Sequence, residues 1–337
     1  MSRYLDSLPH PWTRDDIEKA IFASFTEARD AIEETPGGRL WQSFADLRDS
    51  RWMLQEAITD LLDEISLFGD RSLDPSFWHQ AESAELHKRA VKRYIFNATS
   101  SVMALVDHAR NFQKSYPVHG YAAQLNKSFA VPGLHSFIQC FRNYNTHWRV
   151  AEANWNISKD FLTGVRDARF VVSKRELNRW SGWCVRATEY IQRAPDPIDI
   201  YNVFSEYRKS VHHFYSWHSG ALLDQYASTY QPYLEYKRLH EGLRKKCYWN
   251  MLISHAPASA NPYAYLGRHF TTKQLETLLA LEHRSEAQVD AAITMLGMQD
   301  FCSPELRAKV LLLFKAESCG VERFIQADPA PHGLTQV

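Results

Sequence analysis

The chain has 337 residues, of which 45% are apolar and 13% aromatic, so it can bury one large core or two moderate cores, and global disorder is excluded. Its 39 basic residues balance its 39 acidic residues, which leaves no net charge. The chain as a whole is therefore no general binder of polyanions, and any site that attracts nucleic acid must be local.

The cysteines are odd in number and widely spaced, and they form no Cys-x-x-Cys pair: Cys140, Cys184, Cys247, Cys302 and Cys319. This pattern indicates neither a disulfide framework nor a zinc ribbon, and it is typical of reduced thiols in a core. The first residues lack a basic start followed by an apolar stretch, and no later run approaches the roughly 18 apolar residues of a membrane span. We therefore expect a cytoplasmic protein without membrane contact.

Three helices are predicted in the first third of the chain. Thr13-Arg14-Asp15-Asp16 resembles a capping box and predicts a helix that ends at Pro36-Gly37-Gly38. Apolar residues at helical spacing predict a second helix over 40–69. The segment 75–117 has no internal glycine or proline, and its apolar residues recur at three- and four-residue steps, so it predicts a third, long helix.

The middle of the chain is predicted to be mixed. A shorter helix is expected from Leu134 to about Asn145, followed by two small strands within 150–172 that form a hairpin around Gly164. Ser173-Lys174-Arg175-Glu176 is a second capping-box pattern that opens a helix over 177–191. The segment 198–253 is again predicted to be helical, with a bend or break near Gly220 and Pro232.

Small residues and prolines over 255–262 are typical of a linker. The predicted organisation is therefore a helical domain over 1–254 that includes the N-terminal helices, a linker over 255–262, a small helical C-terminal module over 263–325, and a disordered tail over 326–337. The predicted fold class is mainly α: an antiparallel helical bundle with a small β-hairpin insertion.

One short stretch combines residues that can carry out chemistry at a regular spacing. Phe141 to Trp148 includes Arg142, Asn143 and His147. On a regular helix Asn143 and His147 share a face, whereas Arg142 and His147 diverge by roughly 140°. Arg142 and His147 can line one cleft only if the helix ends or distorts near Thr146 and His147.

These residue types suit the cleavage of RNA without a metal. The reaction needs a base for the ribose 2′-hydroxyl, an acid for the leaving oxygen and a cation for the charge that builds on the phosphate. A histidine ionises near neutral pH and can serve as base or acid, and an arginine fork binds two phosphate oxygens.

The Arg-Asn-x-x-x-His pattern, together with the preceding helix over 94–112, resembles the HEPN superfamily across residues 75–150. Members of that superfamily often act as metal-independent ribonucleases. The resemblance implies that Arg142 contacts phosphate, that Asn143 supports it and that His147 is catalytic. It also implies that Asp107, His108 or Arg110 faces the motif, with Asp107 as an orienter of Arg142 or His147. A homodimer that brings two motifs to one cleft, without cofactor or metal, is implied as well.

Other histidines and basic runs give weaker signals. The spacing of His212, His213 and His218 does not place the three on one helix face, and His240-Glu241 lacks a second histidine, so no metal site is predicted. The basic runs 237–246 and 88–93 are typical of solvated helix faces, and could contact RNA phosphates if they bordered the motif.

The expected function is a metal-independent endoribonuclease of HEPN type that acts as a toxin or phage-defence effector. It would cleave RNA by 2′-hydroxyl attack, and an antitoxin or other partner protein is a possible companion. Two alternatives stay open. One is a non-catalytic HEPN-like module that binds RNA, a nucleotide or a protein, and the other is a helical scaffold whose aromatic surface mediates assembly.

Overall fold

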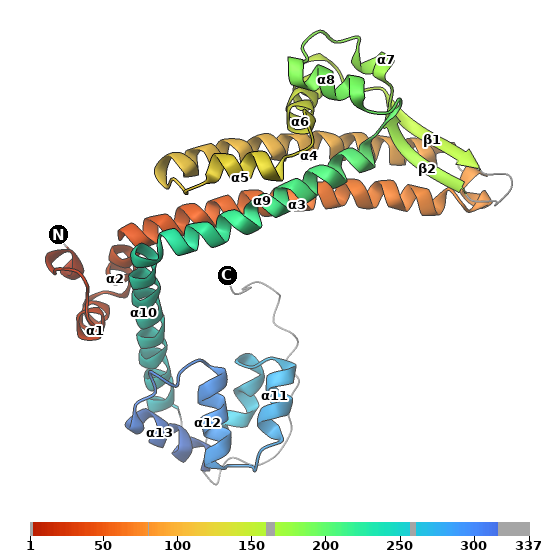
Figure 1. The fold of residues 1–337 in the computed structure, drawn as a ribbon. Helices are drawn as coiled ribbons and strands as arrows, with labels where there is room; N and C mark the ends of the chain where they lie inside the picture. The colour runs from red at the N-terminus through yellow and green to blue at the C-terminus, as the bar shows by residue number, and fades with distance from the viewer. Residues whose placement is uncertain (1–2, 80, 160–165, 257–260, 316–337) are drawn as a thin grey trace. The chain divides into compact units, whose positions relative to one another are not determined.

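The computed structural model describes residues 3–79, 81–159, 166–256 and 261–315 (Figure 1). The chain is mainly α-helical with a small antiparallel sheet, as the sequence predicts. It divides into two compact units. Residues 39–228 form one, here called the inserted unit, and residues 1–38 together with 229–337 form the other, here called the split unit.

Long helices build the inserted unit: α3 (Pro36–Arg71), which starts in the split unit, α4 (Ala81–Ser115) and α9 (Ile200–Gln225). Apolar residues of α3 that recur at three- and four-residue steps, such as Leu54, Ile58 and Leu61, are almost fully buried. Ser50 contacts His108 while Glu64 contacts His87, so α3 and α4 run antiparallel. A 3₁₀ turn, η2 (Pro75–His79), precedes α4.

The first helical segment differs from the prediction. Thr13 caps α1 (Arg14–Ala23) with the predicted capping box, but Ser24 then interrupts the helix and caps α2 (Phe25–Glu33). Pro36 does not end a helix; it is the first residue of α3, where the missing N–H of proline costs nothing.

Shorter helices and the sheet complete the inserted unit: α5 (Tyr121–Ser128), α6 (Leu134–Asn143), a π-helical turn η3 (Tyr144–Trp148), α7 (Lys174–Leu177) and α8 (Val185–Arg193). Strands β1 (Ala153–Lys159) and β2 (Arg166–Val172) pair antiparallel, with Trp155 opposite Phe170. The predicted turn at Gly164 lies outside the described residues. Trp155 stacks on Phe68 of α3 with ring centroids 3.5 Å apart, which attaches the hairpin to the long helices.

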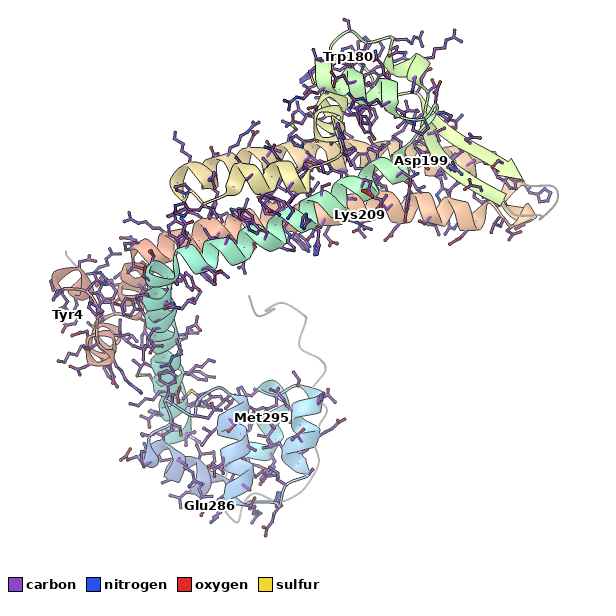
Figure 2. The ribbon with its side chains drawn as sticks, viewed as in Figure 1. Tyr4, Trp180, Asp199, Lys209, Glu286 and Met295 are labelled. Atoms are coloured by element: carbon purple, nitrogen blue, oxygen red, sulfur yellow. The ribbon has the colours of Figure 1, made fainter. Side chains whose placement is uncertain are left out.

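The predicted helix over 198–253 is two helices. Ile198–Asp199 is a third strand, β3, paired with β2, and the Asp199 side chain then caps α9 (Figure 2). The break lies at Tyr226, between α9 and α10 (Ala227–Ser254), and not at Gly220. Pro232 is accommodated inside α10.

The split unit combines η1 (Tyr4–Ser7), α1, α2 and α10 with the turn η4 (Pro262–Arg268) and the helices α11 (Thr272–Leu279), α12 (Glu286–Met295) and α13 (Pro304–Lys315). Residues 263–314 have their own apolar cluster, around Leu278 and Val289. They nevertheless pack with α10, because Phe301 lies against Gly242. The predicted tail 326–337 lies outside the described residues. Among the described helices, none is long and apolar enough to cross a membrane.

Candidate active site

The central motif lies where α6 changes into the π-helical turn η3. The backbone N–H of Arg149 donates to the carbonyl of Tyr144 at 3.1 Å, which is the five-residue hydrogen bond of a π-turn. Residues five apart then lie about one turn from each other. Arg142 Nη1 lies 3.4 Å from His147 Nε2, although a regular helix would separate these side chains.

Asn145 holds this turn from both ends. Its side-chain Nδ2 donates to the carbonyl of Phe141 at 2.8 Å, and its Oδ1 accepts from the backbone N–H of Ala151 at 3.0 Å. Phe141 and Tyr144, both fully buried, anchor the helix end beneath it. The distortion that the sequence required is therefore present, and it begins at Tyr144, slightly before the predicted position.

The two functional side chains meet near the surface. Arg142 is half-buried, whereas Asn143 and His147 are exposed. Arg142 Nη1 also donates to Asn143 Oδ1 at 3.3 Å. A guanidinium only donates, so in this contact His147 Nε2 is placed as the acceptor.

Arg142 is held loosely. Both of its Nη1 contacts are longer than the usual 2.9–3.0 Å of an N–H hydrogen bond, and its Nε is buried without a partner in the described part of the chain. A guanidinium with weak contacts and remaining donors can turn toward an incoming phosphate at little cost.

Asp107 does not join the other predicted site residues. It is exposed on α4 and pairs with Arg110, whose Nη1 lies 3.4 Å from its Oδ1. Within the described residues Asp107 makes no hydrogen bond to Arg142 or His147, and neighbouring His108 contacts Ser50 instead. The structure brings Arg142, Asn143 and His147 together, and the orienting role predicted for Asp107 rests on no direct contact.

A buried ionic network, which the sequence analysis missed, supports the turn from below. The Glu176 carboxylate accepts hydrogen bonds from the Tyr144 hydroxyl at 2.6 Å and from Arg149 Nε at 3.0 Å, and it also pairs with Arg149 Nη2. The backbone N–H of Glu152 adds a further bond at 3.3 Å. Only 5% of the Glu176 side chain is exposed, so these partners replace its lost hydration.

This network changes the ionisation of its members. Burial acts to raise the pKa of Glu176, but the hydrogen bonds from Arg149, Tyr144 and the Glu152 backbone outweigh it and lower the pKa to about 2. Burial and the hydrogen bond to Glu176 raise the pKa of Tyr144 to about 12. At neutral pH the network is therefore a fixed ion pair with a neutral phenol.

The Ser173 side chain accepts a hydrogen bond from the backbone N–H of Glu176 at 3.1 Å, as the second capping box predicts. The Glu176 carboxylate does not complete the box, because it turns to Arg149 instead.

Aromatic rings enclose the ionic network. Trp148 is 41% exposed beside His147; its ring lies 4.8 Å from that of Tyr144 and under the Arg149 guanidinium, also at 4.8 Å. Trp180, labelled in Figure 2, packs its edge against Tyr144 at 5.6 Å.

His218 of α9, one of the closely spaced histidines, contributes to the core and not to this site. His218 is 1% exposed among aromatic rings, including Phe112 and Phe214, and both ring nitrogens lack a partner in the described part of the chain. Burial lowers its pKa to about 4. Within the described residues no group of histidine, cysteine or carboxylate side chains is arranged to hold a metal.

A second histidine constellation lies between α3 and α4. His87 pairs through Nδ1 with Glu64, and its Nε2 lies 3.4 Å from Arg71 Nη1. These residues line a hollow of about 710 Å³ that also contains Asp70 and Asp74. With three carboxylates and one arginine, this hollow disfavours a phosphate. Around Arg142 and His147, by contrast, no carboxylate contacts either side chain in the described part of the chain.

Comparisons of the chain with profiles of protein families, with curated proteins and with solved structures found no match. The resemblance to HEPN proteins over residues 75–150 therefore rests on the motif and its helical setting alone.

Proposed function

We propose that the protein is a metal-independent endoribonuclease of HEPN type, with Arg142 and His147 at its centre and Asn143 in support. The observation that carries the proposal is the 3.4 Å contact between Arg142 Nη1 and His147 Nε2 on an exposed π-turn. On a regular helix, five-residue spacing would not bring the Arg142 guanidinium and the His147 imidazole together; the π-turn does.

The proposed reaction is a transfer within the RNA backbone. His147 Nε2 takes the proton of a ribose 2′-hydroxyl, whose oxygen attacks the adjacent phosphorus. The bond from phosphorus to the 5′-oxygen breaks, giving a 2′,3′-cyclic phosphate and a 5′-hydroxyl. Arg142 turns from His147 to the phosphate oxygens, where its charge offsets the charge that develops.

The leaving 5′-oxygen needs a proton, and the motif supplies one histidine per chain. In the proposed homodimer, His147 of the second copy is the acid while the first is the base. Asn143 would hold the Arg142 guanidinium at the edge of the site. The buried Glu176–Arg149 pair makes no contact with the reacting atoms in this scheme, and keeps the turn in place.

Cleavage of mixed transfer and ribosomal RNA in EDTA tests the proposal. We expect wild type to leave cyclic phosphate ends, and Arg142→Ala and His147→Ala to lose at least about 100-fold in rate, as removal of a general base or phosphate-binding cation does. His213→Ala and Arg186→Ala are matched controls, because both side chains are exposed outside the motif. They should cleave at the wild-type rate, and circular dichroism should show all variants folded.

The same experiment separates cleavage from binding. A reaction that uses one histidine as base and one as acid loses rate on both sides of a pH maximum, whereas binding through Arg142 does not. RNA that is bound but left intact would favour the binding module. Cleavage that persists in folded His147→Ala would rule out the proposed mechanism.

A further inference from the structure

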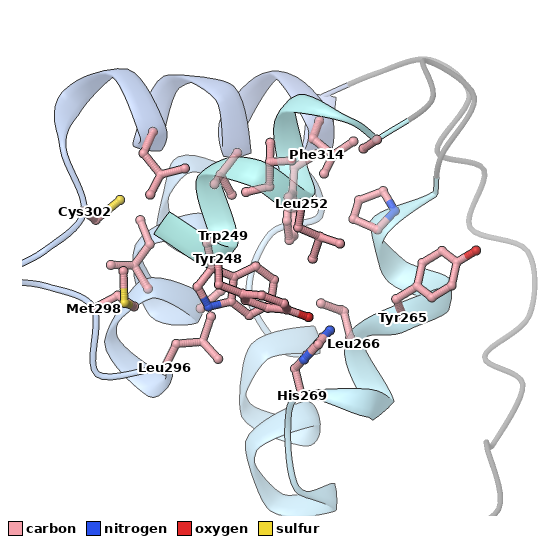
Figure 3. Close-up of a pocket in the computed structure, with 18 of the residues that line it drawn as sticks. Tyr248, Trp249, Leu252, Tyr265, Leu266, His269, Leu296, Met298, Cys302 and Phe314 are labelled. Atoms are coloured by element: carbon pink, nitrogen blue, oxygen red, sulfur yellow. The ribbon is translucent and has the colours of Figure 1, made fainter. Parts of the chain in front are cut away.

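The split unit contains a deep apolar hollow that the proposed ribonuclease does not use. The end of α10, the turn η4, and the helices α12 and α13 surround a cavity of about 710 Å³ (Figure 3). Its volume falls within the roughly 300–1,000 Å³ of small-molecule sites. Large apolar side chains within it are left open to solvent: Tyr248 is 47% exposed, Met251 56%, Leu252 41% and Tyr265 49%.

The floor of the cavity reaches the core of the C-terminal helices. Leu266 and Phe314 line it and are 5% and 4% exposed, and both belong to the apolar cluster of that module. The cavity is therefore walled by packed secondary structure, and an apolar molecule inside it would cover side chains that water now contacts.

Basic side chains line this cavity without an acidic counterpart. No aspartate or glutamate lines it, whereas Arg268, His255 and His269 do. An adjoining hollow shares Tyr248 and Met251 and adds Arg244 and Lys245, again without a carboxylate.

Arg268 differs from Arg238 and Arg307 of this unit in its partners. Arg238 pairs with Asp300 and Arg307 pairs with Asp290. Arg268 is exposed, lies 5.2 Å from the centre of the Tyr265 ring, and has no carboxylate partner in the described part of the chain. An anionic group at the rim would therefore find an uncommitted guanidinium.

His269 provides a polar group of a different kind. Its ring packs edge-on against Trp249, with centroids 4.8 Å apart, and Figure 3 shows both at the cavity. Although the His269 side chain is partly exposed, loss of water around its ring, with Arg268 beside it, lowers the pKa of His269, so the imidazole is neutral at neutral pH and Arg268 supplies the charge. The site thus offers an apolar interior, neutral hydrogen-bonding groups such as His269, and a cation.

We propose that this cavity binds a single small amphiphile with an apolar chain and an anionic end group, of the class of long-chain carboxylates. The apolar chain occupies the space between α10, α12 and α13, and the carboxylate lies at Arg268. Positive charge without acidic neighbours selects an anionic end group over a neutral or cationic one.

Calorimetric titration of the full chain with sodium dodecanoate, below its micellar concentration, tests this proposal. We expect saturable one-to-one binding that Leu252→Asp weakens at least about tenfold, which corresponds to 1.4 kcal/mol, because a carboxylate then lies within the cavity. Leu312→Asp is the matched control: Leu312 is 71% exposed on α13 and does not line the cavity, so its affinity should equal that of wild type.

Arg268→Gln separates the contribution of charge to ligand binding from the contribution of apolar contact. We expect it to weaken dodecanoate binding severalfold and to leave the binding of neutral dodecanol unchanged. Absence of saturable dodecanoate binding, or equal affinity in folded Leu252→Asp, would overturn the proposal.

Two further results would overturn it by identifying another occupant. Dodecanoate binding that appears only after removal of residues 316–337 would assign the cavity to the end of the chain itself. Binding to anionic vesicles without any binding of free dodecanoate would assign it to a membrane surface. None of these results depends on RNA cleavage.

Discussion

The buried Nε of Arg142 has no hydrogen-bond partner in the described part of the chain, and such a group costs about 1–3 kcal/mol. Residues in a core are seldom left in this state. In the proposed mechanism Arg142 leaves His147 to bind phosphate, and a poorly satisfied resting position reduces the cost of that change.

At the residue scale, Glu176 predicts a specific sensitivity to acid. Its folded pKa of about 2 lies below the usual 4.5, so its ionised form stabilises the fold above pH 4.5, and this contribution is lost as the pH falls toward 2. We expect Glu176→Gln to lower the free energy of unfolding at pH 7 by on the order of 3 kcal/mol. The difference from wild type should shrink below pH 4.

Guanidinium unfolding followed by tryptophan fluorescence at pH 7, 4 and 2.5 measures this effect. Glu189→Gln is a suitable control, because Glu189 pairs with Arg193 at the surface and its loss should change stability by less than about 1 kcal/mol. A Glu176→Gln deficit of equal size at all three pH values would show that the carboxylate acts by shape and not by charge.

At the scale of single elements, the π-turn η3 brings the side chains of Arg142 and His147 into contact. We expect Asn145→Ala to remove the hydrogen bonds to Phe141 and Ala151, so that the turn relaxes and Arg142 separates from His147. RNA cleavage should fall at least about tenfold, since small displacements of catalytic groups cost this much. Helix content by circular dichroism should be unchanged.

Asn178→Ala is the matched change at an exposed asparagine outside the turn, and it should leave the cleavage rate as it is. An Asn145→Ala protein that cleaves RNA as fast as wild type would show that the turn does not depend on this side chain.

Helix α9 carries a second pH-dependent element. His218 is held neutral with a folded pKa of about 4, below the usual 6.5, so the unfolded chain binds the extra proton first. Stability is therefore lost as the pH falls from 6.5 toward 4, by on the order of 3 kcal/mol. We expect His218→Phe to remove this loss, and to leave the protein more stable than wild type at pH 4.5.

Urea unfolding of wild type and His218→Phe at pH 7.5 and 4.5 checks this expectation. His213→Phe, at an exposed position of the same helix, should not change the pH dependence. If wild type and His218→Phe lose stability in parallel over this range, another group is responsible.

Local sequence patterns predicted helices well where buried apolar residues recur at the helical period. The long helices α3 and α4 follow from apolar residues at three- and four-residue steps, and Thr13 and Ser173 mark the starts of α1 and α7. The single helix predicted over 177–191 is wrong, because α7 ends at Leu177 and α8 begins only at Val185. The distortion of the helix between Arg142 and His147 could be stated only as a condition for their contact, because the hydrogen bonds of Asn145 to Phe141 and Ala151 follow from no local pattern. The Glu176–Arg149 pair joins residues 27 positions apart, and no local pattern distinguishes Arg149 from other surface arginines.

At the scale of the whole molecule, the sequence placed a boundary at 255, where prolines and small residues gather. The structure instead joins residues 1–38 to 229–337. A composition change marks a loop, but it cannot show that Tyr233 hydrogen-bonds Glu33, or that Trp12 and Tyr236 pack with ring centroids 5.1 Å apart. Contacts between distant segments decide domain membership, and a single sequence does not contain them.

The two units predict two unfolding transitions. A Cβ at Gly242, in the split unit, would lie 2.2 Å from the Phe301 ring. A Cβ at Gly133, in the inserted unit, would lie 2.3 Å from the carbonyl of Arg186, and Gly133 has a φ of +79°. We expect Gly242→Ala to lower one transition and Gly133→Ala the other, each by about 1–3 kcal/mol.

Scanning calorimetry of wild type and both variants measures these shifts. Gly69→Ala is the control, since a Cβ there meets nothing within 4 Å. A single transition that both variants lower equally would show that the units unfold together.

In the sequence, the inserted unit separates the two parts of the split unit, and this affects how the chain folds during its synthesis on the ribosome. Both crossing points lie side by side, because a Cβ at Gly37 would lie 2.4 Å from the carbonyl of Thr229. The chain that completes the split unit is therefore made some 190 residues after α1 and α2, which at about 5–20 residues per second means a wait of roughly 10–40 s. During that interval α1 and α2 have each other and η1 but lack α10, which later contacts them through His240 and Lys246. Newly made chains would then be open to chaperones or to premature association through this segment.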